Sequence, residues 1–406
     1  METANLVVKR TTSVYHNMQD PYLLKYYYKS QVLNRLQSNE VTGSSPPDIF
    51  IGRFGYPHVY IGPLVPPETG DTSIMGMPEQ WVGMSIPKIV EMRSMLVRGM
   101  YRTKITNADN GRIEEMIKEL ALADKYGSVE EKLSKRPSLG MRLDENSQPY
   151  GPSAVMKDMA LGNIKANKDI EKAYSDTAMT ATNAIVELYN KGTPVSKIQK
   201  SLSAGILGVS SRRKFVPTRW SITAVDDTLS KNRLLTVKEN QPIDSIRLYL
   251  NTALDNRWAI LMVPGSWEYE LVEAWYPNTT WNREGAEIAI YSSYEPFDGR
   301  SKYAEIGGCY YAARLASSEL LDKIGGQAKV VILREAHPGY IMPVGVWNVR
   351  EHVRDTLRSE PLMFDSVKEA LAKVSTFMDI SIPAWIKNSA LLRNLLFQKT
   401  LIATKL

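Results

Sequence analysis

The sequence contains very little cysteine and histidine. Its 406 residues include one cysteine, Cys309, and four histidines, His16, His58, His337 and His352. A single cysteine can form neither an internal disulfide nor a CxxC zinc site. Four scattered histidines do not suggest a histidine-based metal cluster. We therefore predict no zinc site, and we interpret Cys309, inside the apolar helical pattern "GGCYYAARLA", as a small buried side chain.

Long apolar runs are also absent. No run reaches the roughly 18 residues that a membrane helix requires, and the first residues, "METANLVVKR", lack the apolar core of a signal peptide. We therefore expect a cytoplasmic protein with no membrane partner. A 43% apolar share is typical of a globular chain, and 406 residues favour two domains over one.

Acidic residues are missing from two stretches that hold basic ones. The net charge is only +6, but the chain between Glu187 and Asp226 has no acidic side chain, and neither does the chain after Asp379. The first of these intervals contains Lys191, Lys197, Lys200, Arg212, Arg213, Lys214 and Arg219. Blocks of one sign attract polyanions and release their counterions. The two basic stretches therefore favour contact with nucleic acid. The alternative is that they form a solvated face whose charge is balanced by acidic residues elsewhere in the fold.

The patterns predict a mixed α+β fold, with a mainly helical first half and a mixed-sheet α/β second half. Helical patterns occur in the first half at 20–38, 86–99, 111–127, 168–191 and 194–207, with a loop-rich β segment at 39–80. The second half alternates predicted strands at 214–225, 257–264, 267–276, 286–293 and 328–336 with helices at 307–326, 346–359, 366–378 and 382–397.

The stretch "VPTRWSITAVDDTLSK" carries one candidate site. Alternation on a strand would place Arg219 on one face and bring Asp226 and Asp227 to the strand's C-terminal end. Carboxylates there could hold Mg²⁺ or Mn²⁺, and Arg219 could clamp a phosphate. These residues suggest a metal-dependent nuclease or another phosphodiester-processing enzyme. The alternative is that one aspartate caps the next helix and pairs with Arg219.

The stretch "SSPPDIFIGRFGYPHVYIGPLVPP" carries a second candidate site. Arg53 and Phe54 lie between glycines, and Tyr56 follows directly. Basic and aromatic side chains on a glycine-containing turn suit contact with phosphates and stacking on bases. The alternative is a tight β-turn packed by aromatic rings.

Two arginines in "VILREAHPGYIMPVGVWNVREHVR" are further candidates for phosphate binding. Arg334 stands near the end of a predicted buried strand, and Arg350 lies on the following helix, one turn before Arg354. Arginine suits bidentate recognition of phosphate. The alternative is a pair of structural ion pairs with neighbouring glutamates.

The C-terminal stretch "LLFQKTLIATKL" partly matches the peptide that binds sliding clamps. In that peptide a glutamine and an aliphatic residue, followed by two aromatic residues, fill pockets on the clamp. Gln398 and Leu401 match this pattern, whereas Thr404 and Lys405 stand where the aromatic residues belong. A frayed helix end is the alternative.

Four segments together resemble one family: "SPPDIFIGRFGYPHVYIGPL", "FVPTRWSITAVDDTLSK", "YAEIGGCYYAARLA" and "ILREAHPGYIMPVGVWNVRE". They are similar to the archaeal Nre proteins, which are DNA repair factors. The resemblance implies an archaeal source, a role in DNA repair with DNA as partner, and association with the sliding clamp (PCNA) through the C-terminal peptide. It implies an N-terminal region at 1–265, a C-terminal α/β region at 266–380 and a helix with the clamp-binding peptide at 381–406. The chain lacks the N-terminal zinc-binding cysteines of some relatives, and the resemblance assigns no catalytic residue.

Overall fold

A computed structural model describes residues 21–36, 38–137, 148–279 and 281–397 of the chain. The mixed α+β fold predicted from the sequence is confirmed, because helices accompany two six-stranded sheets. The chain forms two compact units. Unit 1 comprises Met1–Leu229 and Ile341–Trp347, and unit 2 comprises Ser230–Tyr340 and Asn348–Leu406.

The sheet of unit 1 has the strand order β1-β5-β6-β4-β3-β2. Its strands are β1 (Glu40–Ser45), β2 (Ile49–Ile51), β3 (His58–Val65), β4 (Val97–Lys104), β5 (Gly127–Leu133) and β6 (Ser153–Leu161). β4 and β6 run parallel, and the other neighbours are antiparallel. The sequence predicted a mainly helical first half, and the six-stranded sheet shows that this prediction is wrong. In β5, buried and exposed positions alternate although three charged residues follow one another, and β4 overlaps the end of a predicted helix.

Most of the described helices of unit 1 are short. The described helices are α2 (Pro21–Arg35), α3 (Ile86–Ser94), α4 (Arg112–Leu122), α5 (Lys168–Ser175), α6 (Ala181–Asn190), α7 (Val195–Ser203) and the first part of α8 (Thr218–Val237). Short 3-10 turns lie at Ser73–Gly76, Pro78–Gln80, Ile105–Asn107 and Ser210–Arg212.

The single helix predicted at 168–191 is wrong, because the chain breaks between α5 and α6. The Asp176 carboxylate accepts hydrogen bonds from the amides of Ala178 and Met179, both at 2.9 Å. Thr180 then caps α6 by accepting from the Asn183 amide at 3.2 Å. These side chains satisfy backbone groups that a continuous helix would have paired.

The strand predicted at 214–225 is also wrong, because this segment leads into α8. The Pro217 carbonyl accepts the Ser221 amide at 3.0 Å and so opens the helix. Ile222, Val225 and Leu229 are all buried. Their spacing of three and four residues is that of one helical face. The β-branched and aromatic residues of this segment, which favoured a strand, are therefore accommodated by packing on a helix.

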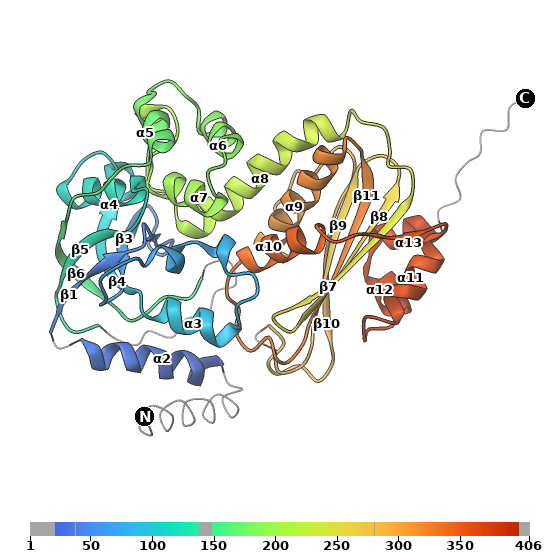
Figure 1. Cartoon of the computed structure of the whole chain (residues 1–406), viewed down its shortest axis with the longest axis horizontal. Helices are drawn as coiled ribbons and strands as arrows, with labels where there is room; N and C mark the ends of the chain where they lie inside the picture. Colours follow the sequence, from blue (N-terminus) through green and yellow to red (C-terminus); the bar gives the residue numbers. More distant parts are fainter. Residues whose placement is uncertain (1–20, 37, 138–147, 280, 398–406) are drawn as a thin grey trace, which may run out of the picture. The chain divides into compact units, whose positions relative to one another are not determined.

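Unit 2 is built on a sheet with the strand order β10-β9-β11-β8-β7-β12. Its elements are β7 (Ile246–Ala253), β8 (Asn256–Pro264), β9 (Glu268–Trp275), β10 (Ala289–Glu295), α9 (Gly308–Ile324), β11 (Ala328–Ala336), α10 (Trp347–Thr356), β12 (Leu362–Phe364), α11 (Val367–Ser375), α12 (Ile382–Asn388) and α13 (Ala390–Phe397). β9 and β11 are parallel, and the other neighbours are antiparallel. Helices α11–α13 pack on one face of the sheet, and α9 lies on the other (Figure 1).

Two buried glutamates attach the C-terminal helices to this sheet. Glu270 in β9 accepts the amides of Ala390 and Leu391, at 3.0 and 2.8 Å, at the beginning of α13. Glu335 in β11 accepts the amide of Ile380 at 2.8 Å. Carboxylates in these positions satisfy backbone donors that would otherwise be buried without partners.

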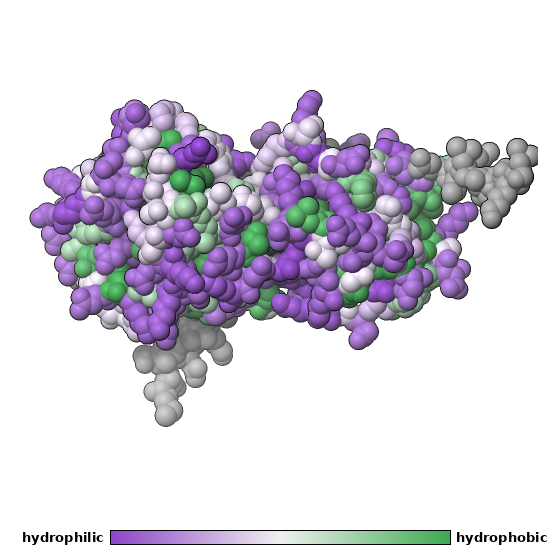
Figure 2. All heavy atoms as spheres, turned by 90° about the horizontal axis from the view of Figure 1, so that it is seen from above, coloured by the Kyte–Doolittle hydropathy of each residue, from purple (hydrophilic) through white to green (hydrophobic). Residues whose placement is uncertain are grey.

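The described helices include none that is long and apolar enough to cross a bilayer. Figure 2 shows a face on which polar residues cover most of the surface and apolar residues form small, separate patches. Scattered apolar residues of this kind are normal on a globular fold.

We predict that Glu131→Gln stabilises unit 1 increasingly as the pH rises. Burial raises the pKa of the Glu131 carboxyl well above its usual range, although a hydrogen bond from the Gly99 amide opposes this. The native state therefore retains a proton that the unfolded chain releases above a pH of about 4.3. The wild type should lose up to about 1.4 kcal/mol of stability per pH unit, and a glutamine has no proton to release.

The measurement is urea unfolding of both proteins at several values between pH 5 and 7.5. Glu130→Gln is the matched control, because the Glu130 side chain is exposed on the same strand. Stability curves of wild type and Glu131→Gln that run parallel over this range would contradict the prediction.

Candidate nucleic-acid interface

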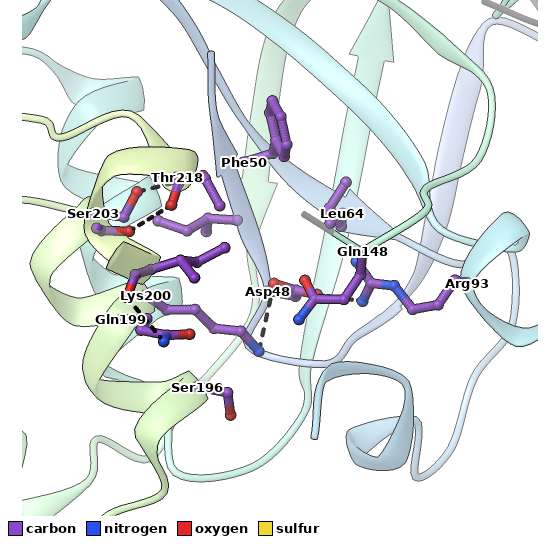
Figure 3. A pocket seen from close by; sticks show the side chains of 13 residues that line it. Asp48, Phe50, Leu64, Arg93, Gln148, Ser196, Gln199, Lys200, Ser203 and Thr218 are labelled. Carbon is purple, nitrogen blue, oxygen red and sulfur yellow. Dashed lines mark hydrogen bonds and ion pairs between the residues drawn. The ribbon is translucent and has the colours of Figure 1, made fainter. Parts of the chain in front are cut away.

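A buried ion cluster centres on Asp48, which directly precedes β2. One carboxylate oxygen of Asp48 lies 2.5 Å from Nη1 of Arg93 in α3, and the other lies 3.4 Å from Nζ of Lys200 in α7. Figure 3 shows the three side chains converging from three separate elements. The cluster therefore joins segments that are far apart in the sequence.

The remaining polar atoms of this cluster also have partners. Arg93 donates to the carbonyls of Pro149 and Met75, at 2.9 and 2.7 Å, and Lys200 donates to the carbonyl of Gly76 at 2.6 Å. Burial lowers the pKa of Lys200, and the nearby Asp48 carboxylate partly restores it. Of two cavities that Lys200 lines, the one shared with Asp48 and Arg93 measures about 20 Å³ and has room for about one water molecule, and the other measures about 310 Å³. The charges of the cluster are therefore paired with one another and with backbone carbonyls, which indicates a structural role.

Asp226 and Asp227 lie in the middle of α8, neither at a strand end nor at a helix N-terminus. Asp226 is fully buried and accepts a hydrogen bond from Gln199 Nε2 at 3.2 Å. Successive helical residues point about 100° apart, so Asp227 faces a different direction and is half-buried. Arg219 is half-buried in the first turn of the same helix. A metal-dependent nuclease built on these three residues therefore gains no support from the geometry.

One group of three side chains has the composition of a metal site. Ligand atoms of Glu335, His337 and Asp379 lie within 4.8 Å of one another. However, Glu335 already accepts two backbone amides, and Asp379 lies 2.5 Å from Nη1 of Arg257. Among the described residues, neither Asp226 nor Asp227 belongs to such a group.

Arg334 and Arg350 are both buried, so neither reaches solvent where a phosphate could approach. Arg334 Nη1 lies 2.6 Å from a Glu273 carboxylate oxygen, and its guanidinium lies about 5 Å from the ring centres of Trp258 and Trp275. Arg350 is 1% exposed and lies beside Glu351. Arg334 therefore matches the structural ion-pair alternative.

The candidates around residue 53 lie on an exposed surface of unit 1, together with part of the basic stretch. We define the aromatic-basic surface as Arg53, Phe54, Tyr56, Tyr60, Arg102, Lys104, Arg212, Lys214 and Trp220, all of which are exposed. Its members come from the loop between β2 and β3, from β3 and β4, from the segment that leads into α8, and from the first turn of α8.

Hydrogen bonds donated by backbone amides join these segments. The Ile51 amide donates to Thr218 Oγ1 at 2.9 Å, which connects β2 to the start of α8. The Ile105 amide donates to the Pro57 carbonyl, and the Phe215 amide donates to the Ile105 carbonyl, both at 2.9 Å. The loop, the end of β4 and the basic stretch are therefore held side by side.

The segments that supply this surface carry no acidic side chain and lie within the stretches 49–67, 92–108 and 188–225. However, Glu114 and Asp158 line one open pocket together with Arg102 and Lys104. Glu114 accepts a hydrogen bond from Thr103, and Asp158 pairs with Arg112.

Within the described residues, none of the five basic side chains of this surface forms an ion pair. Arg213 is different, because its guanidinium donates to the carbonyls of Gly208 and Asp176 and lies over the Tyr174 ring. Arg213 therefore supports the fold, while its neighbours face solvent.

Four members of this surface were not among the predicted site residues: Tyr60, Arg102, Lys104 and Trp220. The β3–β4 register places Tyr60 opposite Arg102 and His58 opposite Lys104. That pairing could not be read from one strand alone, and the predicted helix at 86–99 covers the first residues of β4. The available signal was the absence of acids between Glu91 and Asp109.

Comparison with known proteins identifies the family. Residues 17–282 match the family described as archaeal Nre, N-terminal, and residues 295–403 match archaeal Nre, C-terminal. Together these matches cover most of the chain, which therefore belongs to the archaeal Nre family.

Curated relatives support the same assignment. The chain is 41% identical to the DNA repair protein NreB of Archaeoglobus fulgidus, over 87% of this chain and 89% of that protein. It is 34% identical to the DNA repair protein NreA of Haloferax volcanii, over 86% of this chain and 85% of that protein. No solved structure matches the chain.

We predict that Asp48→Asn strongly destabilises unit 1. The substitution removes the negative charge that compensates Arg93 and Lys200, and both cations are largely buried. Breaking one partner out of a buried ion pair costs about 3–5 kcal/mol. Denaturant unfolding should show a loss of this size, whereas Glu119→Gln on the exposed side of α4 should be nearly neutral. A loss below about 1 kcal/mol would mean that the cluster contributes little.

Proposed function

We propose that this protein is a DNA repair factor that binds DNA through the aromatic-basic surface and associates with the sliding clamp through its C-terminal residues. The observation that carries the DNA-binding part is the exposed positive charge on segments that contain no acidic residue themselves. The repair role is supported by the names of the relatives, which are DNA repair proteins. We expect it to act in the cytoplasm.

The exposed, unneutralised positive charge on this surface favours phosphate contacts. Arg212 and Lys214 are exposed on either side of Arg213, which is itself held by carbonyl groups. A cation whose charge is not already neutralised gains more from a phosphate, because binding releases the counterions of the DNA. Arg53 adds a positive charge on the loop between β2 and β3. Arg219, which is half-buried, directly precedes Trp220 in the first turn of α8.

We predict that Arg212→Glu/Lys214→Glu lowers DNA affinity by about tenfold or more and reduces the salt dependence of binding. Each lost phosphate contact should reduce the slope of log affinity against log salt by about 0.7–0.9. The measurement is fluorescence anisotropy with labelled DNA at several salt concentrations. Lys368→Glu/Lys373→Glu is the matched control, because it changes the net charge equally at two exposed lysines of α11. An equal loss in both variants would indicate a general charge effect and would contradict a local contact.

The proposed clamp contact involves Gln398, Leu401, Thr404 and Lys405, all of which lie outside the described residues. The glutamine and the leucine are two of the anchors by which such peptides fill the pockets of a clamp. Thr404 and Lys405 offer less apolar surface than the aromatic residues of the full pattern. We therefore expect a moderate affinity that can be improved.

We predict that Gln398→Ala/Leu401→Ala removes clamp binding, whereas Thr404→Phe/Lys405→Phe strengthens it by about tenfold or more. Burying one aromatic side chain contributes about 1.5–3 kcal/mol. Calorimetry with purified clamp would measure both changes, and DNA affinity should serve as the control. If neither variant changes clamp binding, the contact lies elsewhere on the protein.

A further inference from the structure

The aromatic-basic surface exposes four aromatic rings. The exposed fractions are 62% for Phe54, 46% for Tyr56, 37% for Tyr60 and 44% for Trp220. Large aromatic side chains normally contribute their area to a core or an interface. Their concentration on one surface of unit 1, among cations that form no ion pair within the described residues, indicates a ligand that offers both planar apolar faces and negative charge.

Two of these rings form a pair. The Tyr56 and Trp220 ring centres are 5.1 Å apart, and the ring planes meet at 53°. The rings come from the β2–β3 loop and the first turn of α8, which the Ile51–Thr218 hydrogen bond holds together. Because the rings are tilted rather than stacked, they do not cover each other completely, and almost half of each residue remains exposed.

The cations are arranged alongside these rings. On the paired strands β3 and β4, Tyr60 stands opposite Arg102. Lys104 follows two residues later, and two-residue spacing keeps it on the same face of the sheet. Phe54 is approached by the guanidinium of its neighbour Arg53, 5.0 Å from the ring centre. A strand of nucleic acid lying here could therefore meet aromatic faces and cations in turn.

We infer that this surface binds single-stranded DNA, with unpaired bases stacking on Tyr56 and Trp220 and phosphates contacting Arg102 and Lys104. The inference rests on the proposed DNA-binding function and adds the class of DNA. In a duplex, the faces of the bases are covered by their neighbours, so the rings would find no partner. Single-strand-binding surfaces combine stacking aromatics with a positive groove, and each base–aromatic contact contributes strongly to affinity.

The test compares a labelled oligothymidylate with a duplex of equal length by anisotropy at one salt concentration. Trp220→Ala and Tyr56→Ala should each weaken single-strand binding by about tenfold and leave duplex binding nearly unchanged. Trp220→Phe keeps an aromatic face and should retain most of the affinity. Trp281→Ala, at another exposed tryptophan, is the matched control. Trp220→Ala should leave the salt slope unchanged, because it removes no charge.

The outcomes separate this inference from the proposed function. If the duplex binds at least as tightly as the single strand, and if both alanine variants behave like the wild type, the stacking role is overturned. The DNA-binding proposal would stand in that case if Arg212→Glu/Lys214→Glu still weakened binding. If neither DNA binds, both proposals fail. Thermal unfolding of each variant shows whether a lost affinity reflects a lost contact or a lost fold.

Discussion

One buried carboxylate, that of Asp48, holds together the part of unit 1 that carries its exposed charge. Its ion pairs with Arg93 and Lys200 join the start of β2 to α3 and α7. A charged pair in a poorly polarisable interior is costly to separate, so these elements are expected to keep their positions together. β2 leads directly into the loop with Arg53, and α7 leads into the segment with Arg212. The paired charges inside therefore determine where the unpaired charges outside are presented.

The protein uses its arginines in two distinct ways. Arg98 is buried against the rings of Phe50 and Tyr150, and Arg334 is enclosed by aromatic rings and a glutamate. Arginines of this kind stabilise packing and add little to the field outside the protein. Arg102 and Arg212 have no such partner among the described residues and remain exposed. A modest net charge is thus compatible with a strongly positive local surface.

The sequence predicted the fold class and most elements of the second half, because long apolar strands such as β8 and β11 have clear patterns. The secondary-structure prediction failed where the side chains of a segment favoured one structure and their tertiary contacts favoured another. The segment at 218–229 is rich in strand-forming residues but packs as a helix, and Asp176 interrupts a helical pattern through its own hydrogen bonds. The candidate site was partly predictable, since Arg53 and Phe54 were recognised on their turn. Trp220 and Lys104 join them only through contacts between distant segments, which a single sequence does not reveal.

The attachment of α13 to the sheet limits how the following residues can meet a partner. Glu270 secures the first turn of this helix, which ends at Phe397. Gln398 is the next residue, and Leu401 is the fourth after Phe397. Four residues reach about 14 Å even when fully extended. A partner that takes both side chains must therefore come close to α13 itself. With so few residues between α13 and these side chains, a partner bound there would have only a narrow range of orientations relative to unit 2.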